Sequence, residues 1–228
     1  MTTLPTRWPA QHPDRIQLYS LATPNGQKIG IALEELGLPY EAHVINIMKG
    51  DQFDPEYIPI NPNSKIPAII DPDGPGGEPL AIMESGAILL HLAEKAGALL
   101  PADPAARSQA IQWLFFQVGS IGPMLGQFGH FYKFAKGKTD TYGETRYGKE
   151  TTRLLGVLEG QLSDGRDWLV GEYSVADISI VPWINALDYY EGKDAVGYSD
   201  FPLVDAWCKR FNARPGVQRG VKVCGFGD

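Results

Sequence analysis

The sequence predicts an α/β domain followed by an all-helical domain. The length permits this division, because 228 residues correspond to one large domain or two small ones at roughly 100–200 residues per domain. Hydrophobic residues make up 43% and charged residues 21%, an ordinary globular composition. Near residue 100 the pattern changes from alternating β-like and helical runs to helical runs alone. A chain of this length buries about 70% of its unfolded surface, so it needs no metal or disulfide to fold.

The first strands and helix follow a parallel β-α-β order. Residues 16–19 are a short apolar run, typical of a buried strand. Residues 28–36 repeat apolar side chains at a helical period, and Gly37 stands where a glycine ends a helix. Residues 40–47 alternate in character and predict a second strand. We expect these elements to form a right-handed βαβ unit.

An antiparallel hairpin and a second helix follow. Residues 67–70 and 80–83 predict two strands, joined by the Pro- and Gly-rich residues 71–78. A helix is expected next, from Ser85 as N-cap to Gly97 just past its end. A βαβ unit extended by such a hairpin has a thioredoxin-like topology.

The second half predicts a bundle of helices. Residues 99–106 carry two prolines and suit a linker. The expected domains are therefore residues 16–98 and 106–224. Within the second, helical patterns cover residues 107–132, 142–162, 174–190 and 201–212.

Charge and composition exclude several partners. The net charge is −7, and Lys and Arg form no basic run, which argues against nucleic acid and anionic membranes. No run approaches 18 apolar residues, and the first 15 residues lack an apolar signal core, so we expect a cytoplasmic protein. The two cysteines, Cys208 and Cys224, are expected to be reduced. None of the four histidines has an i,i+4 partner, so no metal site is expected.

The turn Thr23-Pro24-Asn25-Gly26 is the first candidate site. It lies between the first strand and the first helix. A helix N-terminus stabilises anions, including thiolates, and a Thr hydroxyl or Asn amide could donate to a sulfur. An ordinary capped turn explains the same residues. No cysteine lies here, so a reactive thiol would have to arrive with a ligand.

Two further segments could bind a ligand. A cis bond before Pro67 would free the backbone of Ile66 for a ligand, whereas a trans proline at a strand edge is the simpler alternative. Glu84 and Ser85, at a helix start, could bind the ammonium and carboxylate of an amino acid, or serve only as a cap.

Two other features are interpreted as mainly structural. Ser174 and Asp177 have the spacing of a capping box, which stabilises a helix by roughly 1 kcal/mol. The aromatic residues between positions 113 and 134 are expected in the core, although some could line an apolar cleft.

Together these motifs resemble the cytosolic glutathione transferases over residues 16–222. Within that superfamily the chain is similar to the bacterial Nu class, which includes glutathione-dependent disulfide-bond oxidoreductases. The T-P-N-G turn and the run W-L-F-F-Q-x-G-x-x-G-P-M-L-G are the most specific parts. The resemblance also rests on YSLATPNGQKI (19–29), GDQF (50–53), NPNSKIPAI (61–69), ESGAILLHLAEK (84–95) and YSVADISIVPW (173–183).

The resemblance implies a role for each motif. Thr23 and Asn25 match the positions that hold the glutathione sulfur in the Nu class. Glu84 and Ser85 match those that grip the γ-glutamyl ammonium and carboxylate. By the same resemblance, glutathione is the expected cofactor, with one or two molecules in each site.

Other implied contacts lie along the bound peptide. Gln52 and Lys65 match contacts to the glycyl end. Ile66 is expected to pair its backbone with the cysteinyl unit, and Pro67 to be cis.

The helical domain is expected to contribute three residues. Arg146 matches an arginine that reaches the bound peptide from the partner subunit of a homodimer, and Phe131 and Tyr132 are expected to face a second ligand. The first 15 residues lie outside the resemblance and receive no role.

Three functions fit these residues. The first is a glutathione-dependent disulfide reductase, in which glutathione supplies the thiol and Cys208 and Cys224 are dispensable. The second is a transferase that conjugates electrophiles, or an enzyme of the lyase or ether-cleaving type. The third is a non-catalytic, glutathione-binding regulatory protein. Tyr19 and Ser20 lie close enough to the turn to remain alternative hydroxyl donors.

Overall fold

The structure, a computed structural model, describes residues 4–138 and 140–226. Within these residues the chain forms two compact units. One unit holds the chain up to Ala98 together with the segment from Pro215, and the other holds Leu99–Arg214. In the described part of the chain, no helix has the length and apolar character needed to cross a membrane.

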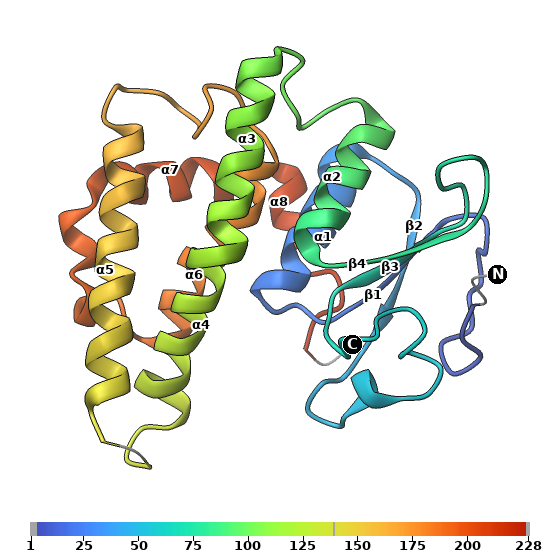
Figure 1. Ribbon diagram of the computed structural model, residues 1–228, viewed down its shortest axis with the longest axis horizontal. Helices are drawn as coiled ribbons and strands as arrows, with labels where there is room; N and C mark the ends of the chain where they lie inside the picture. Colours follow the sequence, from blue (N-terminus) through green and yellow to red (C-terminus); the bar gives the residue numbers. More distant parts are fainter. Residues whose placement is uncertain (1–3, 139, 227–228) are drawn as a thin grey trace. The chain divides into compact units, whose positions relative to one another are not determined.

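The first unit is built around a mixed four-stranded sheet (Figure 1). Its order is β2-β1-β3-β4, with β1 parallel to β2 and antiparallel to β3, and with β3 antiparallel to β4. This arrangement confirms the predicted α/β class and the hairpin. The elements are β1 (Ile16–Ser20), α1 (Pro24–Leu36), β2 (Tyr40–Val44), η1 (Asp51–Phe53), β3 (Ala68–Asp71), β4 (Leu80–Met83) and α2 (Ser85–Ala96).

The starts of the two helices differ from the sequence prediction. Helix α1 begins at Pro24, one turn earlier than its apolar period indicates, because Thr23 caps it and proline occupies its first position. The prediction of Ser85 as N-cap is wrong. Glu84 occupies that position without a side-chain hydrogen bond, and Ser85 is the first helical residue. Gly97 ends α2 in the left-handed conformation, as expected.

The C-terminal segment does not belong to the helical unit. Helix α8 (Pro215–Gly220) packs against α1 within the first unit. A Cβ atom on Gly30 of α1 would lie 2.4 Å from the carbonyl oxygen of Gly220, so the two helices touch through their backbones. The predicted boundary of the second domain at residue 224 is therefore wrong, because contiguity in sequence does not reveal such a backbone contact.

The second unit is a helical bundle, as predicted. Its expected first helix, residues 107–132, is interrupted twice by wider turns. At the first, Gly122 N donates to Gln117 O, five residues back, and at the second Ala135 N donates to His130 O. Proline at position 123 cannot donate to a carbonyl four residues earlier, which favours the first widening. The elements are α3 (Pro104–Phe116), η2 (Gln117–Ile121), α4 (Gly122–Gly129), η3 (His130–Phe134), α5 (Tyr142–Leu162), α6 (Val175–Tyr190), η4 (Asp194–Val196), η5 (Tyr198–Asp200) and α7 (Pro202–Asn212).

The predicted capping box of α6 is confirmed. Asp177 is fully buried and accepts four hydrogen bonds, from Leu169 N, from Ser174 N and Oγ, and from Trp207 Nε1. Burial raises the pKa of Asp177 to about 6, and these donors oppose that rise. One carboxylate thus joins α6 to α7 and to the segment that precedes α6.

Candidate functional site

The turn that starts α1 is tightly constrained. Thr23 has extended backbone angles, and its Oγ1 accepts a hydrogen bond of 3.4 Å from Gly26 N. A Cβ atom on Gly26 would lie 1.9 Å from the carbonyl oxygen of Leu21, so only glycine fits there. The first backbone N–H groups of α1 and the positive end of its helix dipole lie at this turn. Because its oxygen accepts from Gly26, the Thr23 hydroxyl keeps its hydrogen for donation.

A buried lysine connects this turn to the start of α2. The side chain of Lys28, in the second turn of α1, is only 1% exposed. Its Nζ donates to Asn25 Oδ1 at 2.8 Å and to Ser85 Oγ at 3.1 Å. The structure thus brings together two predicted site residues that lie 60 positions apart in the sequence. Burial lowers the pKa of Lys28 to about 7, while the charge of Glu84 opposes this change.

Glu84 is held in an unusual backbone conformation. Its φ of 68° and ψ of 116° lie outside the regions that residues with a side chain normally occupy. Such a conformation costs of order 1–3 kcal/mol and is concentrated at functional sites. The side chain of Glu84 is exposed, and Ser85 beside it is buried at the first position of α2. An exposed carboxylate next to a buried hydroxyl suits the two charges of an amino acid.

The segment before β3 contains the predicted cis bond. The Ile66–Pro67 peptide bond is cis, which confirms that expectation. The carbonyl oxygen of Lys65 accepts hydrogen bonds from Tyr57 Oη at 2.5 Å and Asn61 Nδ2 at 2.8 Å. These contacts fix the chain next to Ile66, and the Lys65 side chain is exposed.

Gln52 contributes an unsatisfied polar atom. It lies in η1, and its Oε1 is buried without a hydrogen-bond partner among the described residues. A buried acceptor without a partner is costly, so this atom suits a ligand that carries a donor.

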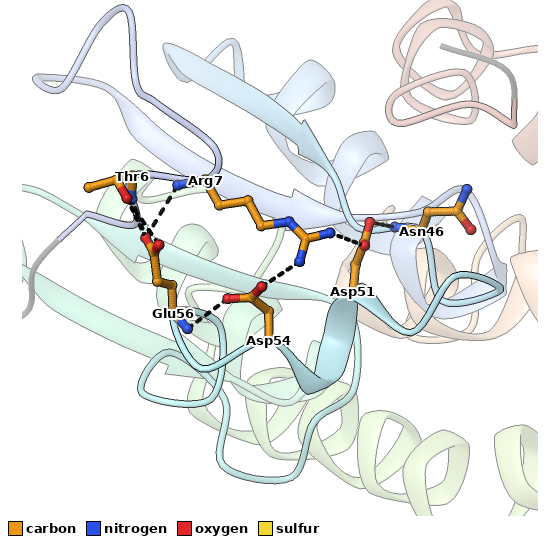
Figure 2. A network of polar contacts seen from close by, with 6 residues as sticks. All are labelled: Thr6, Arg7, Asn46, Asp51, Asp54 and Glu56. Atoms are coloured by element: carbon orange, nitrogen blue, oxygen red, sulfur yellow. Dashed lines mark hydrogen bonds and ion pairs between the residues drawn. The ribbon is translucent and has the colours of Figure 1, made fainter.

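The N-terminal segment holds the loop that carries Gln52 (Figure 2). The guanidinium of Arg7 bonds to Asp51, at 2.5 Å, and to Asp54. Thr6 bonds to Glu56 through both its backbone nitrogen and its hydroxyl. Residues assigned no role from the sequence therefore fasten η1 and the turn after it. Residues 1–3, part of the same prediction, lie outside the described residues.

The alternative hydroxyl donors are both buried. Tyr19 is fully buried and stacks on His43 with ring centroids 4.8 Å apart. Burial raises the pKa of Tyr19, which disfavours a phenolate. Ser20 is 1% exposed and donates to the carbonyl oxygen of Leu21. Neither residue therefore offers its hydroxyl at the surface of the turn.

Neither cysteine of the chain presents an exposed thiol. Cys208 and Cys224 are free and buried. Burial raises the pKa of Cys208 to about 12, so it is not a thiolate at neutral pH. The carbonyl oxygen of Cys224 accepts from Ala22 N at 2.9 Å, and its Sγ lies 3.6 Å from His43 O. Among the described residues, no group of three side chains could hold a metal ion.

Three predicted residues belong to the second unit. Arg146 is exposed on α5. Phe131 stacks on Tyr147, and Tyr132 stacks on Phe128, so each aromatic is half-buried within its own bundle. Their part in binding stays a prediction.

A hollow of about 490 Å³ in the second unit contains none of the predicted site residues. It is lined by residues of α3, among them Trp113 and Phe116, by residues of α5, and by Arg166 in the segment after α5.

The sequence matches known proteins in both units. Residues 22–95 match the N-terminal domain of glutathione S-transferases, and residues 142–215 match the C-terminal domain. The disulfide-bond oxidoreductase YfcG of Escherichia coli (strain K12) is 44% identical, over 93% of this chain and 97% of that protein. The chain belongs to the glutathione S-transferase family.

Solved structures of this family show the same fold with ligands. A glutathione transferase from Pseudomonas putida has a TM-score of 0.93 and 53% identity, over 95% of this chain and 94% of that one. It holds one glutathione disulfide in each subunit. A family member from Pseudomonas fluorescens pf-5 has the same score and identity, over 95% and 96% of the two chains, and holds two glutathione molecules.

Proposed function

We propose that this protein is a glutathione-dependent disulfide reductase of the Nu class, with Thr23 and Asn25 at the sulfur of bound glutathione. The observation that carries the proposal is the capped turn at the start of α1. It offers hydrogen-bond donors at a helix N-terminus but has no cysteine of its own, and both thiols of the chain are buried. The reacting thiol therefore belongs to the ligand.

The groups of the first unit fit glutathione part by part. Ser85 and the start of α2 suit the γ-glutamyl carboxylate, and Glu84 suits the ammonium. The backbone of Ile66 suits the cysteinyl unit, which carries one peptide donor and one acceptor.

The glycyl end is assigned to two further side chains. The unpartnered Oε1 of Gln52 suits the glycyl peptide N–H, and the exposed Lys65 suits the terminal carboxylate. The glutathione disulfide and the glutathione molecules held by the P. putida and P. fluorescens relatives support glutathione as the ligand.

The energy required of the turn is modest. A cysteine-like thiol has an unperturbed pKa of about 8.5, so a drop of ~2 units, or about 2.7 kcal/mol, makes the thiolate dominant at pH 7. A helix N-terminus and one or two charge-assisted hydrogen bonds supply energies of this size.

The overall reaction balances with two glutathione molecules. Two glutathione thiols reduce one disulfide, giving glutathione disulfide and two product thiols, by successive thiol–disulfide exchange. The protein orients the ligand, keeps it ionised at sulfur and contributes no cysteine. The name and high identity of YfcG, a disulfide-bond oxidoreductase, favour this reaction over attack on carbon.

The proposal also covers the location and the oligomeric state of the protein. We infer a cytoplasmic homodimer in which Arg146 of a second copy reaches the bound peptide, and in which Phe131 and Tyr132 face a second ligand. The exposure of Arg146 on α5 is compatible with this role.

Paired steady-state assays test the function. The purified protein is given glutathione with a small organic disulfide, and separately glutathione with an aryl halide. The same assays are run on Thr23→Ala and Asn25→Ala. We expect faster disulfide turnover, with a loss of tenfold or more, about 1.4 kcal/mol, in at least one variant.

Each contrary result selects another function. Faster aryl conjugation would replace the reductase by a transferase. Bound glutathione with no turnover in either assay would favour the regulatory protein.

A further inference from the structure

Lys28 occupies a position that the proposed function leaves unexplained. A lysine is almost never fully buried unless it is paired, because taking an ammonium out of water is costly. Here the ammonium lies between α1 and α2 and donates to one side chain from each, Asn25 and Ser85. Those are the residues assigned to the sulfur and to the γ-glutamyl carboxylate.

The direction of these hydrogen bonds determines what each partner offers to a ligand. An asparagine side chain has one acceptor oxygen and one amide nitrogen that donates. When Oδ1 accepts from Lys28, the amide nitrogen of Asn25 becomes the end that can donate to a sulfur. A serine hydroxyl has a single hydrogen, so when its oxygen accepts from Lys28 that hydrogen is available for a carboxylate.

We propose that Lys28 is a positioning residue that orients the donors of Asn25 and Ser85 toward the two anionic ends of bound glutathione. This inference rests on the proposed function, because it takes the sulfur and γ-glutamyl positions from it. Lys28 acts through its two partners and does not itself contact the reacting sulfur.

The electrostatics of the site agree with this role. Burial lowers the pKa of Lys28 to about 7, while Glu84 favours the charged form. A ligand that brings a thiolate and a carboxylate to the neighbouring donors adds negative charge near the ammonium. Binding then favours protonated Lys28, the form with the most hydrogens to donate.

The test measures glutathione binding and the ionisation of its thiol, without a disulfide substrate. Affinity is measured by calorimetry, and the pKa of the bound thiol by the ultraviolet absorbance of its thiolate. In Lys28→Met we expect weaker affinity, by tenfold or more, and a bound thiol whose pKa is at least one unit higher. Lys28→Gln, which keeps a donor but no charge, is expected to be intermediate and provides a second variant if the first does not fold.

Lys95→Met is the matched control. Lys95 is an exposed lysine of α2 that bonds to Asp71, and no hydrogen bond among the described residues joins it to Asn25 or Ser85. We expect this variant to bind glutathione with wild-type affinity and an unchanged thiol pKa. An effect as large as that of Lys28→Met would overturn the proposal, since it would show that the loss of any lysine charge weakens binding and raises the thiol pKa.

Double variants separate orientation from a general effect of charge. If Lys28 acts through Asn25, adding Lys28→Met to Asn25→Ala raises the thiol pKa little further. Likewise, adding it to Ser85→Ala weakens binding little further. Additive effects, or a Lys28→Met variant with wild-type affinity and thiol pKa, would overturn the proposal.

The same binding and activity measurements distinguish a failure of the proposed function from a failure of the role of Lys28. A wild-type protein that does not bind glutathione contradicts the proposed function and removes the basis of this inference. A wild-type protein that binds glutathione and reduces disulfides, with Lys28→Met unchanged in both binding readouts, contradicts the role of Lys28 alone.

Discussion

Replacing Lys28 with methionine is expected to stabilise the protein while it impairs the site. The lysine ammonium is buried, and its pKa falls from 10.5 to about 7 in the folded chain. At roughly 1.4 kcal/mol for each pKa unit, this difference corresponds to about 5 kcal/mol of unfavourable free energy. Methionine has a similar length and carries no charge, so it removes this cost.

The cost depends on pH in a defined direction. Below about pH 7 the lysine is protonated in both the folded and unfolded chains, so the full penalty is present. Between about pH 7 and 10.5 the unfolded chain binds more protons than the folded chain, and the stability of the wild type therefore rises with pH. From about pH 6 to about pH 9 this rise amounts to roughly 2–3 kcal/mol.

The substitution also removes two hydrogen bonds. Asn25 Oδ1 and Ser85 Oγ lose their donor, which costs about 2–3 kcal/mol in total. We therefore expect Lys28→Met to be about 2 kcal/mol more stable than the wild type near pH 6. Near pH 9 the two proteins should be about equally stable, because most of the penalty of the lysine has gone.

Urea unfolding of both proteins across this pH range provides the assay. The quantity of interest is the difference in the free energy of unfolding, because other titrating groups cancel in it. A difference that stays constant with pH, or a variant less stable than the wild type at every pH, would contradict this prediction. Either result would mean that Lys28 is not held as a costly buried cation.

Three other predictions each concern the substitution of one residue. Asp177→Ala leaves four buried donors without their acceptor and should lower the free energy of unfolding by about 3 kcal/mol or more; a loss below about 0.5 kcal/mol in urea unfolding would contradict this. Arg7→Ala releases the loop after β2 and should raise the KM for glutathione several-fold with little change in kcat. Arg153→Ala, which removes an exposed ion pair on α5, should change neither constant. Gly26→Ala places a Cβ atom 1.9 Å from the carbonyl oxygen of Leu21 and should weaken glutathione binding tenfold or more by calorimetry, so wild-type affinity would show that the turn tolerates a side chain.

The sequence predicts those features that depend on local chemistry. The turn at Thr23 combines a cap, a proline and a glycine within four residues, so the sequence alone predicts its position. The capping box of Ser174 and Asp177 is equally local. The cis bond at Pro67 was expected from the family motif, because X-Pro chemistry alone favours the trans form.

The features that escaped prediction depend on contacts between distant parts of the chain. Lys28 is separated from Ser85 by 57 positions, and within a helical period it reads as one polar residue among several. Arg7 meets Asp51 and Asp54 across 44 and 47 positions. Helix α8 joins the first unit through the contact of Gly30 with Gly220, which no sequence pattern predicts. Opposite charges and pairs of glycines recur throughout a sequence, so only the fold reveals which of them meet.

The most direct measurement is the rate of disulfide reduction by glutathione in a protein that lacks both cysteines. Cys208→Ala and Cys224→Ala are combined, and Asn25→Ala is then added in the same background. We expect the cysteine-free protein to keep kcat/KM near that of the wild type, because both thiols are buried. We expect Asn25→Ala to lower kcat/KM by tenfold or more, about 1.4 kcal/mol. A cysteine-free protein that stays folded and loses its activity, or an Asn25→Ala variant with full activity, would contradict the claim that bound glutathione supplies the reacting thiol at this turn.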